Sequence, residues 1–150
     1  MSTARALREA FDARFAPLGL NLTQAGVIAY LRDFGPVSQT QIADHLRIGR
    51  AATGVIIDRL QDRGLIERLP DAVDRRVWRV SLSAPGTAMA LQIQGIDEVL
   101  RAELRVGITR DERQALASVL TRVQLNVDRA VSSSTPGSTA QTPSSTTERP

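Results

Sequence analysis

The chain has 150 residues, 42% of them hydrophobic, and a formal net charge of +3 at pH 7. That length and apolar content suit one small domain, and the 3% aromatic content means that aliphatic side chains must build its core. The absence of cysteine excludes disulfides and a thiol-oxidation switch. No apolar run long enough for a membrane span and no export signal is apparent, so we expect a cytoplasmic protein with no membrane partner.

Arginine supplies all 19 basic residues of the chain. A guanidinium keeps its charge at any accessible pH and binds phosphate or guanine through two parallel hydrogen bonds. The net charge is nevertheless modest, so charge alone does not predict nucleic-acid binding.

Residue patterns that carry catalysis or bind metal ions are absent from the sequence. The only histidine, His45, has no acid or cysteine partner at ligand spacing. No glycine-rich phosphate loop, nucleophile elbow or paired-carboxylate pattern appears either. We therefore predict no enzymatic activity, no metal and no cofactor.

Two amphipathic helices are predicted at the start of the chain. Leu7, Phe11 and Phe15 lie four residues apart and give residues 3–16 one apolar stripe. A second helix is predicted over about residues 21–35, with Thr23 as its N-cap and with Ala25, Ile28, Leu31 and Phe34 on its buried side.

Two shorter helices follow. Ser38 and Gln41 have the spacing of a capping box, which predicts a helix start at Ser38. The helix is expected to break at Ile48-Gly49, where glycine permits a turn that most residues resist. The next helix carries Thr53, Ile56, Ile57 and Leu60 at helical spacing and ends at Gly64. Two short helices joined by a turn predict a helix-turn-helix.

A β-hairpin is predicted directly after this motif. Residues 65–69 and 77–82 have the composition of strands, and residues 70–76 form a polar turn between them. A basic hairpin beside a helix-turn-helix can reach phosphates or the minor groove, so this hairpin is a candidate wing.

The remainder of the chain predicts two long helices and a tail. Ser83 is expected to cap a helix over about residues 84–106, and Thr109 with Glu112 forms a second capping box that opens a helix over 110–131. Both helices carry apolar stripes that one protomer has too little protein to cover. Residues 132–150 are nearly all Ser, Thr, Pro, Gly and Gln, a composition that predicts a disordered tail.

The order of these motifs resembles the MarR family of winged helix-turn-helix regulators. Members show a second helix ending in Leu-x-x-x-Gly-Leu-Ile/Val-x-Arg, an Asp-x-Arg wing tip and a Leu-Thr-x-x-Gly that closes the wing. This chain has the corresponding residues in the same order, over a match of about residues 7–131: Leu60, Gly64, Leu65, Ile66 and Arg68, then Asp74-Arg75-Arg76, then Leu82-Ser83-Ala84-Pro85-Gly86.

The resemblance implies a mainly α fold with a small β wing. Residues 1–131 would form the MarR-like domain, with 21–83 as the winged helix-turn-helix core and 1–20 and 84–131 as dimerisation helices. It implies a DNA-binding transcriptional regulator, a repressor that binds a pseudo-palindromic operator in double-stranded DNA as a homodimer and is released by a small-molecule effector. The alternative is a winged-helix protein-interaction module without sequence-specific DNA binding.

The resemblance also assigns site residues. DNA contact is expected from Ser38, Thr40, Arg50, Ala51, Thr53, Gly54, Asp74, Arg75 and Arg76. Relatives often hold small, aromatic, acidic effectors between the second helix, the first helix and the wing domain, where Tyr30 and Arg32 could line a pocket. An interhelical packing face and a solvated arginine are the alternative interpretation of these two residues.

The helix expected to read bases departs from the family pattern. Members place Ser or Thr at the positions of Ala51, Ala52 and Gly54, which are small and apolar here. If Thr53, Ile57 and Leu60 face inward, the outward residues are Arg50, Ala51, Gly54, Val55 and Asp58. Arg50 is then the candidate for contact with guanine, and Ala51 and Val55 suit thymine methyl groups.

Overall fold

The computed structural model describes residues 2–133, and the chain divides into two compact units, residues 1–106 and 107–150. The tail predicted to be disordered lies outside the described residues from position 134 on. Ser132 and Ser133, which were assigned to that tail, are helical instead.

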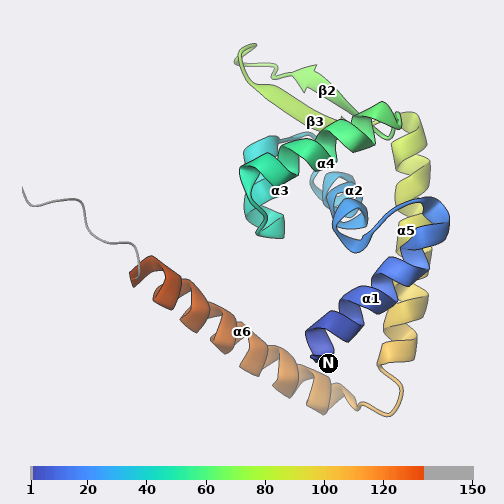
Figure 1. Cartoon of the computed structure of the whole chain (residues 1–150), viewed down its shortest axis with the longest axis vertical. Helices are drawn as coiled ribbons and strands as arrows, with labels where there is room; N and C mark the ends of the chain where they lie inside the picture. Colours follow the sequence, from blue (N-terminus) through green and yellow to red (C-terminus); the bar gives the residue numbers. More distant parts are fainter. Residues whose placement is uncertain (1, 134–150) are drawn as a thin grey trace, which may run out of the picture. The chain divides into compact units, whose positions relative to one another are not determined.

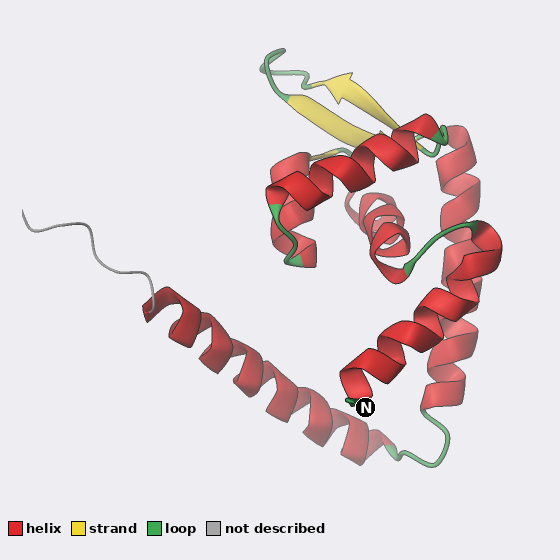
Figure 2. Ribbon diagram, in the orientation of Figure 1, coloured by secondary structure: helices red, strands yellow, loops and turns green. Residues whose placement is uncertain are grey.

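The first unit contains five α-helices and a small sheet (Figure 1). The elements are α1 (Thr3–Phe15), η1 (Ala16–Leu18), α2 (Leu22–Phe34), β1 (Val37–Ser38), α3 (Gln39–Leu46), α4 (Arg50–Asp62), β2 (Ile66–Pro70), β3 (Trp78–Leu82) and α5 (Ala84–Leu104). The strands form one antiparallel sheet in the order β1-β3-β2, with Val37 opposite Val80 and Arg68 opposite Val80 on the other side (Figure 2). The predicted fold class, mainly α with a small β wing, is confirmed.

The second unit is described over one helix, α6 (Arg110–Ser133). The predicted capping box opens it: Glu112 Oε2 accepts from Thr109 N at 2.8 Å, and Thr109 Oγ1 accepts from Glu112 N at 3.3 Å. The Thr109 amide and the Thr109 hydroxyl, which donates to Glu112 Oε2 at 2.8 Å, lower the pKa of Glu112. None of the helices in the described part of the chain is both long and apolar enough to cross a membrane.

The core of the first unit lies between helices α1 to α5 and the sheet and is largely aliphatic. Its fully buried members include Phe15, Val27, Ile28, Ile42, Ile57, Leu60 and Val80. The helical spacing of these residues in the sequence is what turns one face of each helix toward this core.

One predicted N-cap is wrong, and the predicted break at Ile48-Gly49 is correct in position but not in its cause. The N-cap of α2 is Asn21 rather than Thr23: Asn21 Oδ1 accepts from Gln24 N, and Asp12 of α1 holds the Leu22 amide at 2.6 Å. The left-handed residue after α3 is Arg47, with φ of 52°, whereas Gly49 is extended and serves as the N-cap of α4. Asn competes better than Thr for an N-cap, and αL is open to residues other than glycine at a modest cost.

Gly86 lies where the first turn of α5 passes close to the backbone of Leu65. A Cβ added there would lie 1.8 Å from the carbonyl oxygen of Leu65, at the exit of α4. The predicted cap at Ser83 is confirmed by the bond from Gly86 N to Ser83 Oγ at 3.1 Å, and Ser83 Oγ in turn donates to the Gly64 carbonyl at 2.6 Å. The Gly of the wing-closing motif is therefore required by packing of backbone on backbone.

We predict that Gly86→Ala destabilises the protein by at least about 1–3 kcal/mol, because the backbone must shift to admit the methyl group. Gly95→Ala in the same helix is the control, since a Cβ there meets nothing within 4 Å. That control should be stabilising by roughly 0.4–1 kcal/mol. Urea unfolding of both variants tests this, and equal stabilities would contradict it.

Candidate nucleic-acid interface

The helix-turn-helix is formed by α3 and α4, and local bonds fix where α3 begins. Ser38 Oγ accepts from Gln41 N at 3.2 Å, and Gln41 Oε1 accepts from Ser38 N at 2.9 Å, which confirms the predicted capping box. The Ser38 hydroxyl proton is not used by these bonds, and Thr40, two residues further on, is exposed. Both hydroxyl groups can therefore donate to an external phosphate.

The two faces of α4 divide as the sequence indicates. Thr53, Ile57 and Leu60 are fully buried, whereas Arg50, Ala51, Val55 and Asp58 are exposed and Gly54 is half-buried. One expectation needs correction: Thr53 is 0% exposed, and its Oγ1 donates to the Gly49 carbonyl at 3.0 Å. A duplex cannot reach Thr53 in this conformation, so its role is to secure the first turn of α4.

The wing turn is organised by Asp71, a residue that the sequence analysis did not single out. Its Oδ1 accepts from the amides of Val73 and Asp74 at 2.9 and 3.0 Å, and its Oδ2 accepts from Arg79 Nε at 2.6 Å. The amides of Asp74 and Val73, followed by the Arg79 guanidinium, lower the pKa of Asp71 to about 2. Its carboxylate thus ties the turn to strand β3.

Asp74 orients the backbone of the wing tip. Asp74 Oδ1 accepts from the backbone amide of Arg76 at 3.0 Å, and the Asp74 carbonyl accepts from Val77 N at 2.9 Å. The guanidinium groups of Arg75 and Arg76 form no ion pair within residues 2–133, and the same holds for Arg50. Arg59, exposed on α4, forms no ion pair within these residues either, so the uncommitted cations of α4 and the wing are Arg50, Arg59, Arg75 and Arg76.

Arg68 connects the wing to α4. Its guanidinium donates from β2 to Asp58 at 2.5 Å and also to Gln61, both on α4. The arginine that ends the Leu-x-x-x-Gly-Leu-Ile-x-Arg motif therefore fixes the hairpin against this helix. In Figure 1 the wing loop extends on the same side as the beginning of α4.

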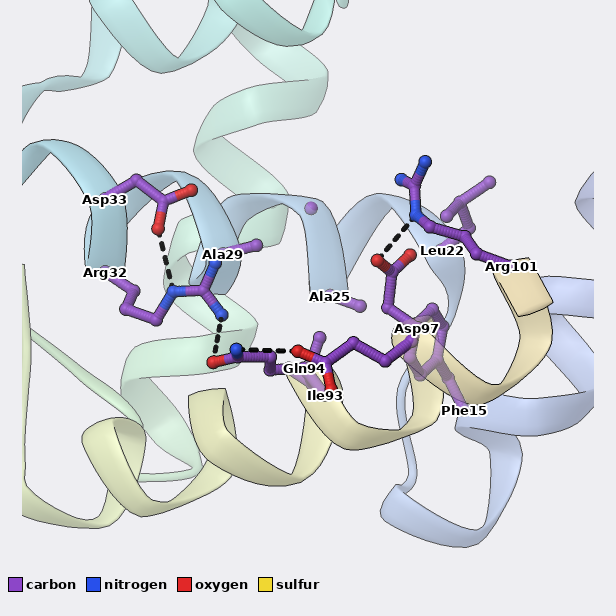
Figure 3. Close-up of a pocket in the computed structure, with 12 residues that line it drawn as sticks. Phe15, Leu22, Ala25, Ala29, Arg32, Asp33, Ile93, Gln94, Asp97 and Arg101 are labelled. Carbon is purple, nitrogen blue, oxygen red and sulfur yellow. Dashed lines mark hydrogen bonds and ion pairs between the residues drawn. The ribbon is translucent and has the colours of Figure 1, made fainter. Parts of the chain in front are cut away.

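A cavity of about 410 Å³ lies between α1, α2 and α5 (Figure 3). Apolar residues form part of its wall, among them Phe15, Leu22, Ala25 and Ile93. Arg32 lines the cavity, as the sequence analysis allowed. Tyr30 does not line it: its ring stacks on His45 of α3, with 4.1 Å between centroids, and contacts Phe34 at 4.7 Å.

Both arginines of the cavity are already paired. Arg32 Nε donates to Asp33 at 2.8 Å, which raises the pKa of Arg32 and lowers that of Asp33, and Arg101 Nε donates to Asp97 at 2.6 Å. Gln94 joins the Arg32 guanidinium to Glu98, at 3.2 and 2.8 Å (Figure 3). The lining thus holds three carboxylates against two guanidinium groups.

We predict that the wing loses its fixed structure between about pH 4 and pH 2. The folded pKa of Asp71, about 2, lies below the ordinary value of 3.8, so its stabilisation is present above pH 4 and is lost as pH falls through 2. Emission of Trp78, the only tryptophan, should follow this transition while far-UV circular dichroism tests that the helices persist.

Asp71→Asn should abolish that transition, because an amide binds the Arg79 guanidinium without charge. Asp74→Asn is the matched control and should keep it, since the Asp74 backbone amide still reaches Asp71. An unchanged transition in Asp71→Asn would show that another group controls the wing.

Comparison with known proteins supports the resemblance to MarR-family regulators. The MarR family model matches residues 18–77. The transcriptional regulator SlyA shares the fold, with 24% identity, a TM-score of 0.77, and coverage of 85% of this chain and 89% of that chain. A "probable transcriptional regulator" from Pseudomonas aeruginosa is 28% identical, with a TM-score of 0.68 and coverage of 80% and 92%.

A third structure is a cysteine-to-serine variant of MarR from E. coli complexed with operator DNA. It is 26% identical, with a TM-score of 0.74 and coverage of 80% of this chain and 86% of that chain. The family consists of non-enzymatic regulators, and its solved structures support a DNA-binding regulator here. The resemblance seen in the motifs is thus confirmed: over residues 18–77 and in its fold, the chain is similar to the winged helix-turn-helix regulators of the MarR family.

Proposed function

We propose that this protein is a transcriptional repressor that binds a pseudo-palindromic operator as a homodimer and releases it when a small molecule occupies each protomer. The observation that carries the proposal is the pair of uncommitted basic groups, Arg50 on the outward face of α4 and Arg75-Arg76 on the wing. An exposed helix face flanked by a basic hairpin fits a major groove and the phosphates beside it.

Each predicted contact residue has a distinct role in this arrangement. Arg50 suits the O6 and N7 acceptors of guanine, and Ala51 with Val55 suits thymine methyl groups. Ser38 and Thr40 are placed for phosphate contact at the start of α3. Asp74 acts through the backbone of the wing tip and leaves Arg75 and Arg76 to meet the duplex.

The alternative function is a protein-interaction module that keeps the fold without sequence-specific DNA binding. The uncommitted guanidinium groups favour DNA, since nothing else in the described chain balances their charge. A gel shift on the promoter of the protein's own gene separates the two functions. Retardation only at the level of unrelated duplexes would favour the interaction module.

We predict that Arg76→Ala weakens binding to all duplexes and lowers the slope of log affinity against log salt by about 1 per protomer, because one phosphate contact is lost. Fluorescence anisotropy over a salt series measures this. Arg8→Ala, which removes an exposed charge from α1, is the control and should leave the slope unchanged. An unchanged slope in Arg76→Ala would place the wing off the DNA.

Dimerisation is supported by the apolar stripe of α6. Leu116, Leu120, Val123, Val127 and Val131 recur at helical spacing, and each is 49–66% exposed. An amphipathic helix whose apolar face meets water is unfavourable at about 25 cal/mol per Å² of apolar surface left uncovered. A second copy would cover this face, and the two-fold symmetry would match an operator with two half-sites.

We predict that Leu120→Glu converts the dimer to monomer or aggregate, because it places a charge in the apolar stripe. Arg122→Glu puts the same side chain on the opposite face of α6 and should leave the dimer intact. Light scattering distinguishes the two. A dimer in Leu120→Glu at micromolar concentration would show that this stripe is not the interface.

The cavity between α1, α2 and α5 is the proposed effector site. Its volume of about 410 Å³ and partly apolar wall suit a small molecule. Its charges do not suit the aromatic acid that the family resemblance implies, because both guanidinium groups are paired and, among the described residues, Glu98 is bonded only to neutral Gln94. We therefore propose an effector with an apolar body and a cationic group directed at Glu98.

We predict that benzylamine raises the melting temperature more than benzoate does at equal concentration, because only the amine gains an ion pair in the cavity. Differential scanning fluorimetry measures this. Glu98→Gln should remove the difference between the two compounds. A larger shift with benzoate would restore the acidic effector.

A further inference from the structure

Gly54 lies inside α4, and its presence there needs a physical reason because glycine is destabilising relative to alanine inside a helix. Gly54 lies on the outward face of α4, one turn after Arg50. Its φ is not in the left-handed region, so the backbone does not require glycine there. The reason must lie in what occupies the space beside it.

That space is filled by the side chain of Gln39, the first residue of α3. A Cβ added at Gly54 would lie 3.2 Å from Gln39 Nε2, closer than most Cβ atoms pack, and apart from neighbouring residues of α4 itself it would meet no other atom within 4 Å. Gln39 Nε2 also donates to the backbone carbonyl of Arg50 at 3.3 Å. The side-chain amide of Gln39 thus lies across the first turn of α4, between Arg50 and Gly54.

The remaining bonding groups of this amide are free to meet a ligand. One N–H of Gln39 is used by the Arg50 carbonyl, while its second N–H and its Oε1 have no partner within residues 2–133. A glutamine amide recognises adenine through this pair of groups, by accepting from N6 and donating to N7. Its anchor beside Arg50 also reduces the side-chain entropy that such a contact would cost.

We propose that Gln39 is a specificity-determining residue that reads an adenine next to the base pair contacted by Arg50, and that Gly54 is glycine in order to admit its amide. The inference rests on the proposed DNA-binding function. Such a contact would add base selectivity beside α4. The outward residues of α4 close to Arg50 are Ala51 and Val55, and these offer only apolar contact.

A purely structural role is the competing explanation, in which Gln39 only braces α3 against α4. A brace, or a phosphate contact, would change affinity for all sequences alike. Base reading would change the preference at one position of each half-site. The measured base preference therefore separates the two roles.

The experiment uses the full chain and three variants: Gln39→Ala, Gly54→Ala and the double variant. Operators are first selected from a randomised duplex library with the unmodified protein, and each position is then scored for the unmodified protein and the three variants. Gln39→Ala should lose preference at one A·T pair per half-site, by about 5- to 150-fold, which corresponds to one bidentate contact. The guanine preference assigned to Arg50 should persist.

Gly54→Ala should cause a loss at the same A·T pair, because its methyl group displaces the amide. The double variant should be no worse than Gln39→Ala. Melting temperatures supply a second readout that does not need DNA: Gly54→Ala should raise the melting temperature more in the Gln39→Ala background than in the parent, since only the parent has an amide in the way.

Three results would overturn the inference. A uniform loss of affinity, or no loss, in Gln39→Ala would exclude base reading by this residue while leaving DNA binding intact. Equal thermal shifts from Gly54→Ala in both backgrounds would exclude the positioning role of Gly54. Absence of any base preference in the unmodified protein would remove the proposed function and this inference with it.

Discussion

The carbonyl group of Leu65 is where three parts of the winged helix meet. It lies directly after α4, it accepts from Ser83 N at 3.1 Å at the end of the wing, and the first turn of α5 passes so close that only glycine fits at position 86. These contacts therefore hold three segments together: the residues after α4, the end of the wing at Ser83 and the first turn of α5. The base of the wing cannot move without also disturbing α4 or α5.

Two arginine side chains connect α4 to other parts of the fold. Arg68 fixes β2 to the middle of α4, and Arg63 at the end of α4 donates to the carbonyls of Leu18 and Gly19 at 2.8 and 2.7 Å. The reading helix is thus attached to the wing and to the segment that joins α1 to α2. That segment leads directly into Leu22, the first residue of α2, which lines the cavity between α1, α2 and α5.

These contacts explain why the count of arginines is a poor guide to DNA binding. Arg63, Arg68 and Arg79 are committed to carbonyl groups or carboxylates inside the fold. Arg50, Arg75 and Arg76 form no ion pair within residues 2–133, so their guanidinium groups are available to an external partner. A modest net charge of +3 is consistent with a basic surface that is small but placed where the helix and wing converge.

Local chemistry made much of the fold predictable. The capping boxes at Ser38 and Thr109 and the cap at Ser83 involve residues three apart, so sequence spacing alone reveals them. Contacts between different elements could not be predicted in this way. Asp71 pairs with Arg79 across the hairpin, and the Tyr30 ring packs on His45 rather than lining the cavity. The two-residue strand β1 is too short to leave a pattern.

Gly54 is another residue whose presence the sequence pattern could not explain. Its position on the outward face was correctly predicted, but the reason for glycine is the side chain of Gln39 from the preceding helix. No periodicity within α4 contains that information. Packing between elements decides which residue types a reading helix can carry, and sequence patterns report it only where the contact is local.

The central claim is that α4 and the wing of a two-fold dimer bind two matching half-sites in DNA. The most direct measurement is selection of a randomised duplex library by the full-length protein, followed by sequencing. The account predicts an inverted repeat whose half-sites are centred about one helical turn, roughly 10 base pairs, apart or a multiple of that spacing. Enrichment of no motif, or of a single asymmetric site, would contradict it.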